Sequence, residues 1–191
     1  MGKIKVTKLE IEGLCVIEPA VFGDNRGYFM ETYNQKDMID AGLDMVFVQD
    51  NQSMSRQGVL RGLHFQKEHP QGKLVRVIRG EVFDVAVDLR KGSATYGAWH
   101  GEILTAENKK QFYIPEGFAH GFYVMSEEAE FCYKCTDFYN AADEGGIRWD
   151  DPTIGVEWPI LEGVPVLLSE KDKKWPFFGV KLLRKVYEKA F

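Results

Sequence analysis

The chain has 191 residues, of which 45% are hydrophobic and 28% are charged, and its formal net charge is −5. This composition is typical of a globular protein with a buried core, so we expect residues 1–191 to form a single domain. The acidic balance argues against a nucleic-acid-binding protein, because such proteins usually carry basic stripes. The sequence has neither a signal peptide nor an apolar run of about 18 residues, which predicts a cytoplasmic protein with no membrane partner.

The first quarter of the chain predicts short strands and one helix. In chain order, the expected segments are one or two strands over 4–17, a turn at 24–27, a strand over 28–33, a helix over 35–41 and extended structure at 46–49. Asn34 can cap the helix with its side-chain oxygen, and Gly42 can end it.

The central part of the chain predicts β-structure throughout. The alternating or apolar segments separated by Gly, Pro, Asn or Ser are 73–79, 82–88, 99–104, 111–114, 121–125 and 130–136. Many short strands at this spacing indicate a sandwich or a small barrel. Three Trp or Trp–Pro sites within 149–176 favour a loop-rich segment, and 181–190 is expected to form a surface helix.

The three cysteines, Cys15, Cys132 and Cys135, are too few and too odd in number for a disulfide scaffold. Cys132-x-x-Cys135 has the spacing of a redox motif, but its segment alternates as a strand does. A redox motif needs the start of a helix, so we expect a structural role for these thiols.

Several polar residues lie where strand patterns predict buried positions. Lys73 shares a face with two valines, and Asp84 lies in the middle of an apolar strand, where a carboxylate needs a histidine or lysine partner. With His64, His120 and Tyr133, these residues form a set of acids and bases with a cation to stabilise an anion. For each residue alone, a structural reading stays open: a lysine at a strand end, a hydrogen-bonded histidine or a core tyrosine.

A metal site of the kind common in double-stranded β-helix proteins is not expected. Pro115-x-Gly-x-x-His120 resembles the later histidine element of such sites. The usual His-x-His pair is missing, because His64 is followed by Phe65 and Gln66. The sequence therefore predicts a site that works without metal.

A series of blocks follows one another over roughly residues 6–180. They include Phe22-Gly-Asp-x-Arg26, Gln49-Asp-Asn51, Arg61-Gly-Leu-His64, Lys73-Leu-Val-Arg-Val, Gly80-Glu-Val-Phe-Asp84, Ile114-Pro-Glu-Gly-Phe-Ala-His120, Tyr133-Lys-x-Thr and Glu144-Gly-Gly-Ile-Arg-Trp-Asp-Asp-Pro152. Together they resemble the dTDP-4-dehydrorhamnose 3,5-epimerase family. The resemblance implies a mainly β, cupin-type jelly roll (a double-stranded β-helix) with short peripheral helices, a homodimer and a site inside the barrel with no metal or other cofactor.

The resemblance also implies roles for individual residues. His64 would be the general base, Asp172 its orienting carboxylate and Tyr133 the general acid, while Lys73 would face the oxyanion on C4. Asp84 would lie behind His120, and Tyr139 would stack on the thymine. The residues implied to bind the substrate are Phe22, Arg26, Phe29, Glu31, Gln49, Asn51, Arg61, Lys73, Asp84, His120, Tyr139, Glu144 and Lys171.

The implied reaction suits these residue types. In a dTDP-linked 4-keto-6-deoxyhexose, the C–H bonds at C3 and C5 are acidified because both lie next to the C4 ketone. A histidine can remove such a proton where a cation stabilises the enolate, and a phenol can return a proton from the opposite face. No redox cofactor is needed. The expected reaction converts dTDP-4-dehydro-6-deoxy-D-glucose into dTDP-4-dehydro-L-rhamnose.

Two alternatives stay open. One is an enzyme that epimerises only C3 or only C5, or isomerises the keto group; the presence of Tyr133 argues against it, because loss of this acid is the simplest route to a narrower reaction. The other is a sugar-nucleotide-binding cupin without catalysis. The joint presence of His64, Asp172, Lys73 and Tyr133 argues against it, because binding alone needs no acid–base pair.

Overall fold

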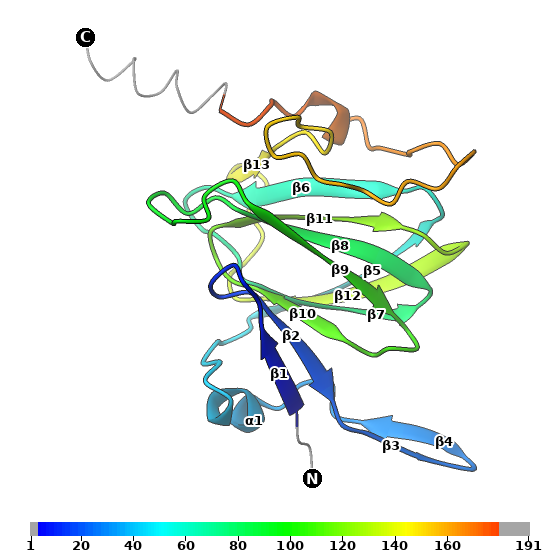
Figure 1. Ribbon diagram of the computed structural model, residues 1–191. Coiled ribbons are helices and arrows are strands. Elements are labelled where there is room, and N and C mark those ends of the chain that lie inside the picture. The colour runs from blue at the N-terminus through cyan, green and yellow to red at the C-terminus, as the bar shows by residue number, and fades with distance from the viewer. Residues whose placement is uncertain (1–3, 180–191) are drawn as a thin grey trace.

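Two antiparallel β-sheets face one another in the computed structural model, which describes residues 4–179 (Figure 1). The six-stranded sheet has the order β1 (Ile4–Lys8), β2 (Cys15–Pro19), β10 (Gln111–Ile114), β7 (Lys73–Arg79), β12 (Glu128–Cys135) and β5 (Gln49–Arg56). The five-stranded sheet has the order β13 (Glu144–Gly146), β6 (Leu60–Gln66), β11 (Phe118–Val124), β8 (Glu81–Asp88) and β9 (Trp99–Thr105). This arrangement confirms the expected mainly β jelly roll.

The main core lies between the two sheets. It combines buried side chains from both of them, among them Val75, Phe112 and Phe131 from one sheet and Leu104 and Phe122 from the other. Side chains alternate between the two faces of a strand, and this alternation explains which residues form the core. On β7, every second residue faces inward, so the face shared by Lys73, Val75 and Val77 is the inner one, as expected.

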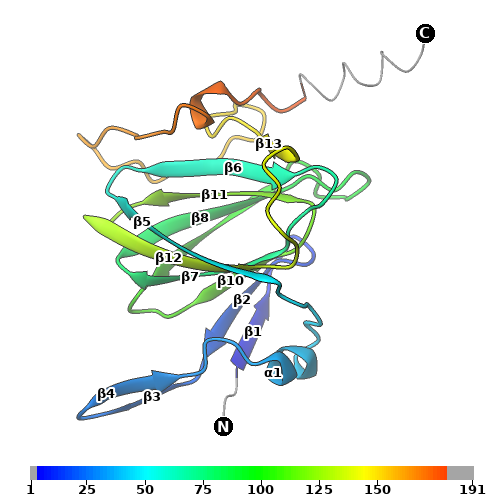
Figure 2. The same cartoon turned by 180° about the vertical axis from the view of Figure 1, so that it is seen from behind.

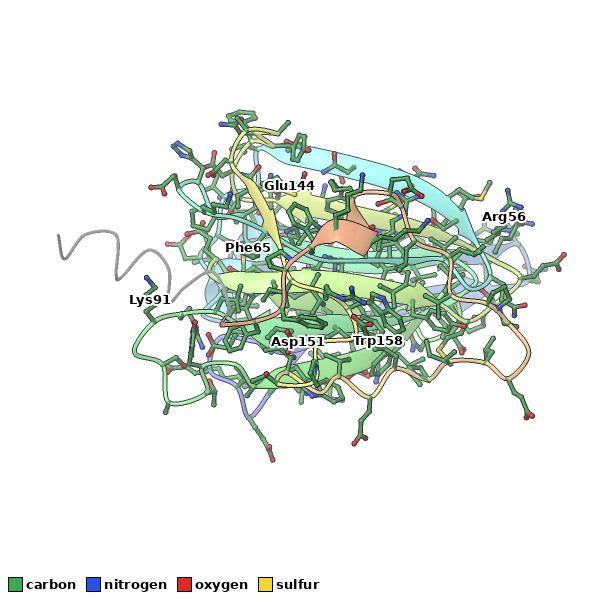
Figure 3. The ribbon with its side chains drawn as sticks, turned by 90° about the horizontal axis from the view of Figure 1, so that it is seen from above. Arg56, Phe65, Lys91, Glu144, Asp151 and Trp158 are labelled. Atoms are coloured by element: carbon green, nitrogen blue, oxygen red, sulfur yellow. The ribbon has the colours of Figure 1, made fainter. Side chains whose placement is uncertain are left out.

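Two smaller layers cover the outer faces of the sheets. Helix α1 (Gln35–Asp40) packs Met38 against the outer side of the six-stranded sheet, next to Cys15 and Leu74. The long C-terminal segment covers the five-stranded sheet, and its 3-10 helix η1 (Asp172–Lys174) lies near β6 (Figure 2). Figure 3 shows from above how this layer, with Asp151 and Trp158, crosses the sheet.

Most of the predicted elements are confirmed, and the differences have local causes. Asn34 caps α1 by accepting hydrogen bonds from two backbone N–H groups, as expected. The strand expected over 28–33 is instead β4 (Gly27–Met30), which pairs with β3 (Val21–Asp24) in an isolated hairpin. It ends early because the chain turns towards the helix cap. The helix expected over 181–190 lies outside the described residues.

The segment after Glu144 is loop-rich, as expected.

The two cysteines of Cys132-x-x-Cys135 both lie on strand β12 rather than at the start of a helix. All three cysteines are free thiols. Within residues 4–179, neither helix has the length and apolar composition that crossing a bilayer requires.

Strand β9 offers a matched test of the core. Leu104 is fully buried between the sheets, whereas its neighbour Ile103 is 44% exposed. Leu104→Ala should lower the free energy of unfolding by about 2–5 kcal/mol, because it leaves a cavity between the sheets. Ile103→Ala should change it by less than about 1 kcal/mol. Urea denaturation measures both, and equal losses would contradict this assignment of the core.

Candidate active site

A short hydrogen bond joins His64 on β6 to Asp172 at the start of η1. The two atoms, His64 Nε2 and Asp172 Oδ1, lie 2.5 Å apart. Asp172 is almost fully buried, and His64 is partly exposed. Burial raises the pKa of Asp172, but hydrogen bonds, first of all from His64, outweigh burial and leave this pKa below its ordinary value. The carboxylate is therefore held in its ionised form against the imidazole.

Backbone pairing brings these distant residues together. Leu167 forms an isolated parallel bridge with Val59, and its carbonyl accepts the N–H of Leu60 at 3.0 Å. Gly58 allows this approach, because a Cβ at its position would lie 2.5 Å from the carbonyl oxygen of Pro165. The C-terminal segment is thus fastened beside the start of β6, and Asp172 follows five residues later along the chain.

A second histidine–carboxylate pair lies on the neighbouring strands. His120 Nε2 is 3.0 and 2.9 Å from the two carboxylate oxygens of Asp84, which is fully buried. Burial raises the pKa of Asp84, and the charge of His120 opposes that shift. This contact confirms the expected partner for a carboxylate in an apolar strand. Because His120 is also the register partner of His64, the two pairs are adjacent.

Lys73 and Tyr133 come from the opposite sheet. Burial lowers the pKa of the Lys73 ammonium, and the charges of Cys135 and Asp84 oppose that shift. Burial raises the pKa of the Tyr133 phenol, and the cation of Arg61 partly opposes it. A phenol is protonated at neutral pH, and a raised pKa makes it a weaker acid, so Tyr133 can give its proton only to a strong base.

A chain of polar contacts borders this group. Tyr139 N–H donates to Gln49 Oε1 at 2.9 Å, and Gln49 Nε2 donates to Asn51 Oδ1 at 2.9 Å. Lys171 Nζ donates to Glu144 Oε1 at 2.6 Å, and the Tyr139 hydroxyl donates to the other Glu144 oxygen at 3.4 Å. Figure 3 places Glu144 on β13, at the edge of the five-stranded sheet. These residues come from separate segments, yet they form one polar rim.

The residues expected to bind substrate thus fall into two sets. The structure brings together His64, Asp172, Tyr133, Lys73, Gln49, Asn51, Arg61, Asp84, His120, Tyr139, Glu144 and Lys171. It leaves apart the residues on or next to the β3–β4 hairpin, namely Phe22, Arg26, Phe29 and Glu31. Both ribbon views show this hairpin at the far end of the molecule from β6 (Figures 1 and 2).

Two contacts of this group escaped the sequence analysis. Ser55 accepts hydrogen bonds from two nitrogens of Arg61, at 3.1 and 3.0 Å, and so orients the guanidinium. Trp175 donates its indole N–H to Asp172 Oδ1 at 3.2 Å. Ser55 lies on a strand whose pattern is polar, and Trp175 lies in a loop, so no periodic signal marked either residue.

Metal binding has no support among the described residues. Between residues 4 and 179, no group of three or more His, Cys, Asp or Glu side chains is arranged to hold a metal ion. The metal independence of the site stays a prediction.

The arrangement combines four chemical capacities. An imidazole backed by a carboxylate can accept a proton, and a buried ammonium can stabilise a developing oxyanion. A protonated phenol can supply a proton, and a planar guanidinium can bind phosphate oxygens. The geometry therefore suits proton transfer next to a carbonyl group in an anionic substrate.

Comparisons with known proteins point in the same direction. The family model described as dTDP-4-dehydrorhamnose 3,5-epimerase matches residues 8–179. The enzyme of that name from Methanothermobacter thermautotrophicus is 56% identical over 175 residues, which cover 92% of this chain and 95% of that protein. The one from Pseudomonas aeruginosa is 56% identical over 177 residues, covering 92% and 97%. A crystal structure of dTDP-6-deoxy-D-glucose-3,5-epimerase from Legionella pneumophila, in complex with dTDP-4-keto-L-rhamnose, has a TM-score of 0.88 and 50% identity, covering 91% of this chain and 92% of that one.

Proposed function

Because this chain belongs to the dTDP-4-dehydrorhamnose 3,5-epimerase family, we propose that it converts dTDP-4-dehydro-6-deoxy-D-glucose into dTDP-4-dehydro-L-rhamnose. The observation that carries the proposal is the 2.5 Å contact between His64 and Asp172, set in one cluster with Lys73 and Tyr133. A histidine held by a buried carboxylate is the usual form of a general base.

In the proposed mechanism, His64 donates its Nε2–H to Asp172, which leaves Nδ1 free to accept the proton from C3 or C5. The electrons of the broken C–H bond move to the C4 oxygen and form an enolate. The ammonium of Lys73 stabilises this oxygen. Tyr133 then donates its hydroxyl proton to the opposite face of the same carbon, which inverts the configuration.

The remaining residues of the cluster would hold the substrate. Arg61, His120 and Glu144 would line the sugar, with Asp84 keeping His120 in place. Gln49, Asn51 and Lys171 would bind the nucleotide part, and Tyr139 would stack on the thymine, a contact worth on the order of 1–3 kcal/mol.

We also propose that the protein is a homodimer in which each β3–β4 hairpin reaches the site of the other copy. Phe22 and Phe29 are 50% and 57% exposed on this hairpin, and a two-stranded hairpin is marginally stable by itself. Arg26 at its turn is exposed and suits a diphosphate, and within residues 4–179 its guanidinium has Asp24 as its only ion-pair partner. A cytoplasmic location stays a prediction.

The reaction can be tested by incubating the protein with dTDP-4-dehydro-6-deoxy-D-glucose in D2O. Deuterium at both C3 and C5, with inversion of both centres, is the expected result. Exchange at one carbon would indicate a single-site epimerase, and binding without exchange would indicate a non-catalytic cupin.

His64→Asn should lower deuterium incorporation at C3 and C5 alike, by about 100- to 10,000-fold, because one base serves both carbons. Mass spectrometry and NMR of the recovered sugar measure this loss. The matched control is His100→Asn, since His100 also lies near a carboxylate, 3.7 Å from Glu102, but on the opposite edge strand β9. Near wild-type exchange in folded His64→Asn protein would refute the assignment.

Tyr133→Phe should keep exchange of at least one α-proton, because His64 is intact, while the doubly inverted product falls by about 100-fold or more. NMR separates exchange from inversion in one sample. Tyr113→Phe is the control: burial raises the pKa of Tyr113 to about 12, yet it packs with Cys15 and Leu74 on the outer side of the sheet. If Tyr133→Phe makes the doubly inverted sugar at the wild-type rate, Tyr133 is only a core residue.

The hairpin exchange can be tested with mixed dimers. Arg26→Ala and His64→Asn should each be impaired alone, but a dimer of one copy of each should regain activity, because one of its sites then contains only unchanged residues. Coexpression with two affinity tags isolates such dimers. His64→Asn paired with Tyr133→Phe should show no recovery, because both changes lie in the same cluster. A monomer in solution, or no recovery in the first pair, would refute this arrangement.

A further inference from the structure

Trp175 contacts both members of the proposed base. Its indole N–H donates to Asp172 Oδ1 at 3.2 Å, and this is the same oxygen that lies 2.5 Å from His64 Nε2. The indole also meets the imidazole of His64 in an edge-to-face arrangement, with ring centroids 6.2 Å apart and planes at 68°. One side chain thus fixes the carboxylate and packs against the ring that the carboxylate orients.

The local sequence explains why the indole lies there. Trp175 follows directly after η1 and adopts extended backbone angles, φ −60° and ψ 144°. Pro176 favours this conformation, because the proline ring disfavours helical angles at the residue before it. The Pro176 carbonyl then accepts the N–H of Arg148 at 3.1 Å, which fastens this turn to the segment after β13.

Gly146 provides the space for the indole. A Cβ at Gly146 would lie 2.3 Å from Cδ2 and 2.4 Å from Cε2 of Trp175, which is too close for any real contact. Gly146 is also the register partner of His64 on the neighbouring strand. The indole therefore lies flat on the strand beside the proposed base, and a side chain at position 146 would displace it.

The chemistry of the indole suits a positioning role. The indole N–H can donate a hydrogen bond but cannot accept one, so Asp172 Oδ1 is always the acceptor in this contact. It therefore restricts rotation of the carboxylate without competing for the proton of His64. The indole hydrogen bond, together with those of His64 and Ser169, also contributes to the lowered pKa of Asp172, against the opposing effect of burial.

We infer that Trp175 is a positioning residue for the proposed base and that it acts through Asp172. This inference rests on the proposed function, in which His64 removes the protons. A residue that only fills space would affect the rate independently of Asp172, whereas a residue that acts through Asp172 has no effect once that carboxylate is gone.

A double-mutant cycle distinguishes the two roles. Trp175→Phe keeps a ring but removes the donor, and it should lower kcat by about ten-fold with KM within about two-fold, because the lost hydrogen bond orients the base and not the substrate. In an Asp172→Ala background, which removes the acceptor of the indole hydrogen bond, the same change should cause no further loss. A multiplicative loss in the double variant, an unchanged kcat, or a change confined to KM would each overturn the inference.

Trp158→Phe is the matched control. Trp158 is also half-buried and followed by proline, and its indole N–H donates to the Trp149 carbonyl at 2.8 Å, away from His64. It should keep the wild-type kcat. Gly146→Ala gives an independent test in case Trp175→Phe does not fold, because it displaces the indole while retaining it. It should lower kcat in the native background and not in the Asp172→Ala background.

The same measurements separate this inference from the proposed function. If the unchanged protein does not exchange deuterium at C3 or C5, the proposed function itself is wrong. If the unchanged protein exchanges both positions and His64→Asn abolishes exchange, but Trp175→Phe and Asp172→Ala lose activity multiplicatively, only the role of Trp175 is wrong.

Discussion

The hydrogen bond between His64 and Asp172 is the contact on which the rest of the site depends. It joins residues separated by 108 positions in the chain, one on a central strand and one at the start of η1. A buried carboxylate is stable only when donors surround it, and here His64 and Trp175 both contact Asp172 Oδ1. The C-terminal segment must therefore be packed on β6 before the pair can exist.

The inside of the barrel combines an apolar half with a charged one. Phe122 and Phe131 stack with centroids 4.3 Å apart, and Phe131 in turn stacks on His120 and contacts the ring of Tyr133. These aromatic rings hold the polar side chains by packing rather than by charge. The buried ions compensate one another, because Asp84 opposes the effect of burial on Lys73 and Lys73 does the same for Asp84. Asp84 also has His120 as a partner, and Lys73 also has Glu144, so loss of one member would weaken this compensation without removing it.

Two carboxylates outside the proposed site, Asp143 and Asp88, hold loops of the barrel in place. Asp143 accepts hydrogen bonds from the backbone N–H groups of Glu68 and His69, and so holds the loop after β6 against the segment before β13. Asp88 is buried and accepts from Arg90, Ser93 and Thr95 at the far end of β8, which closes the loop before β9. Burial raises the pKa of Asp88, but these hydrogen bonds dominate and lower it far below its ordinary value. Asp143 and Asp88 therefore have structural roles. The sequence pattern alone does not distinguish such carboxylates from catalytic carboxylates.

Alternation along single strands was sufficient to predict much of this protein. It placed Lys73 on one face of β7 with Val75 and Val77, which is the inner face in the structure, and it required a partner for Asp84. Side-chain direction in a strand has a period of two, so these conclusions needed no knowledge of the neighbouring strands.

The family blocks added the expected pairing of His64 with Asp172. They also placed Asp84 behind His120. The tertiary structure decided what depends on contacts between distant segments: the hydrogen bonds of Arg61 to Ser55, the place of Trp175 over Gly146, and the separation of the β3–β4 hairpin from the other substrate residues. A local pattern carries no information on which strands become neighbours, because that choice is made by the packing of the two sheets and the C-terminal segment together.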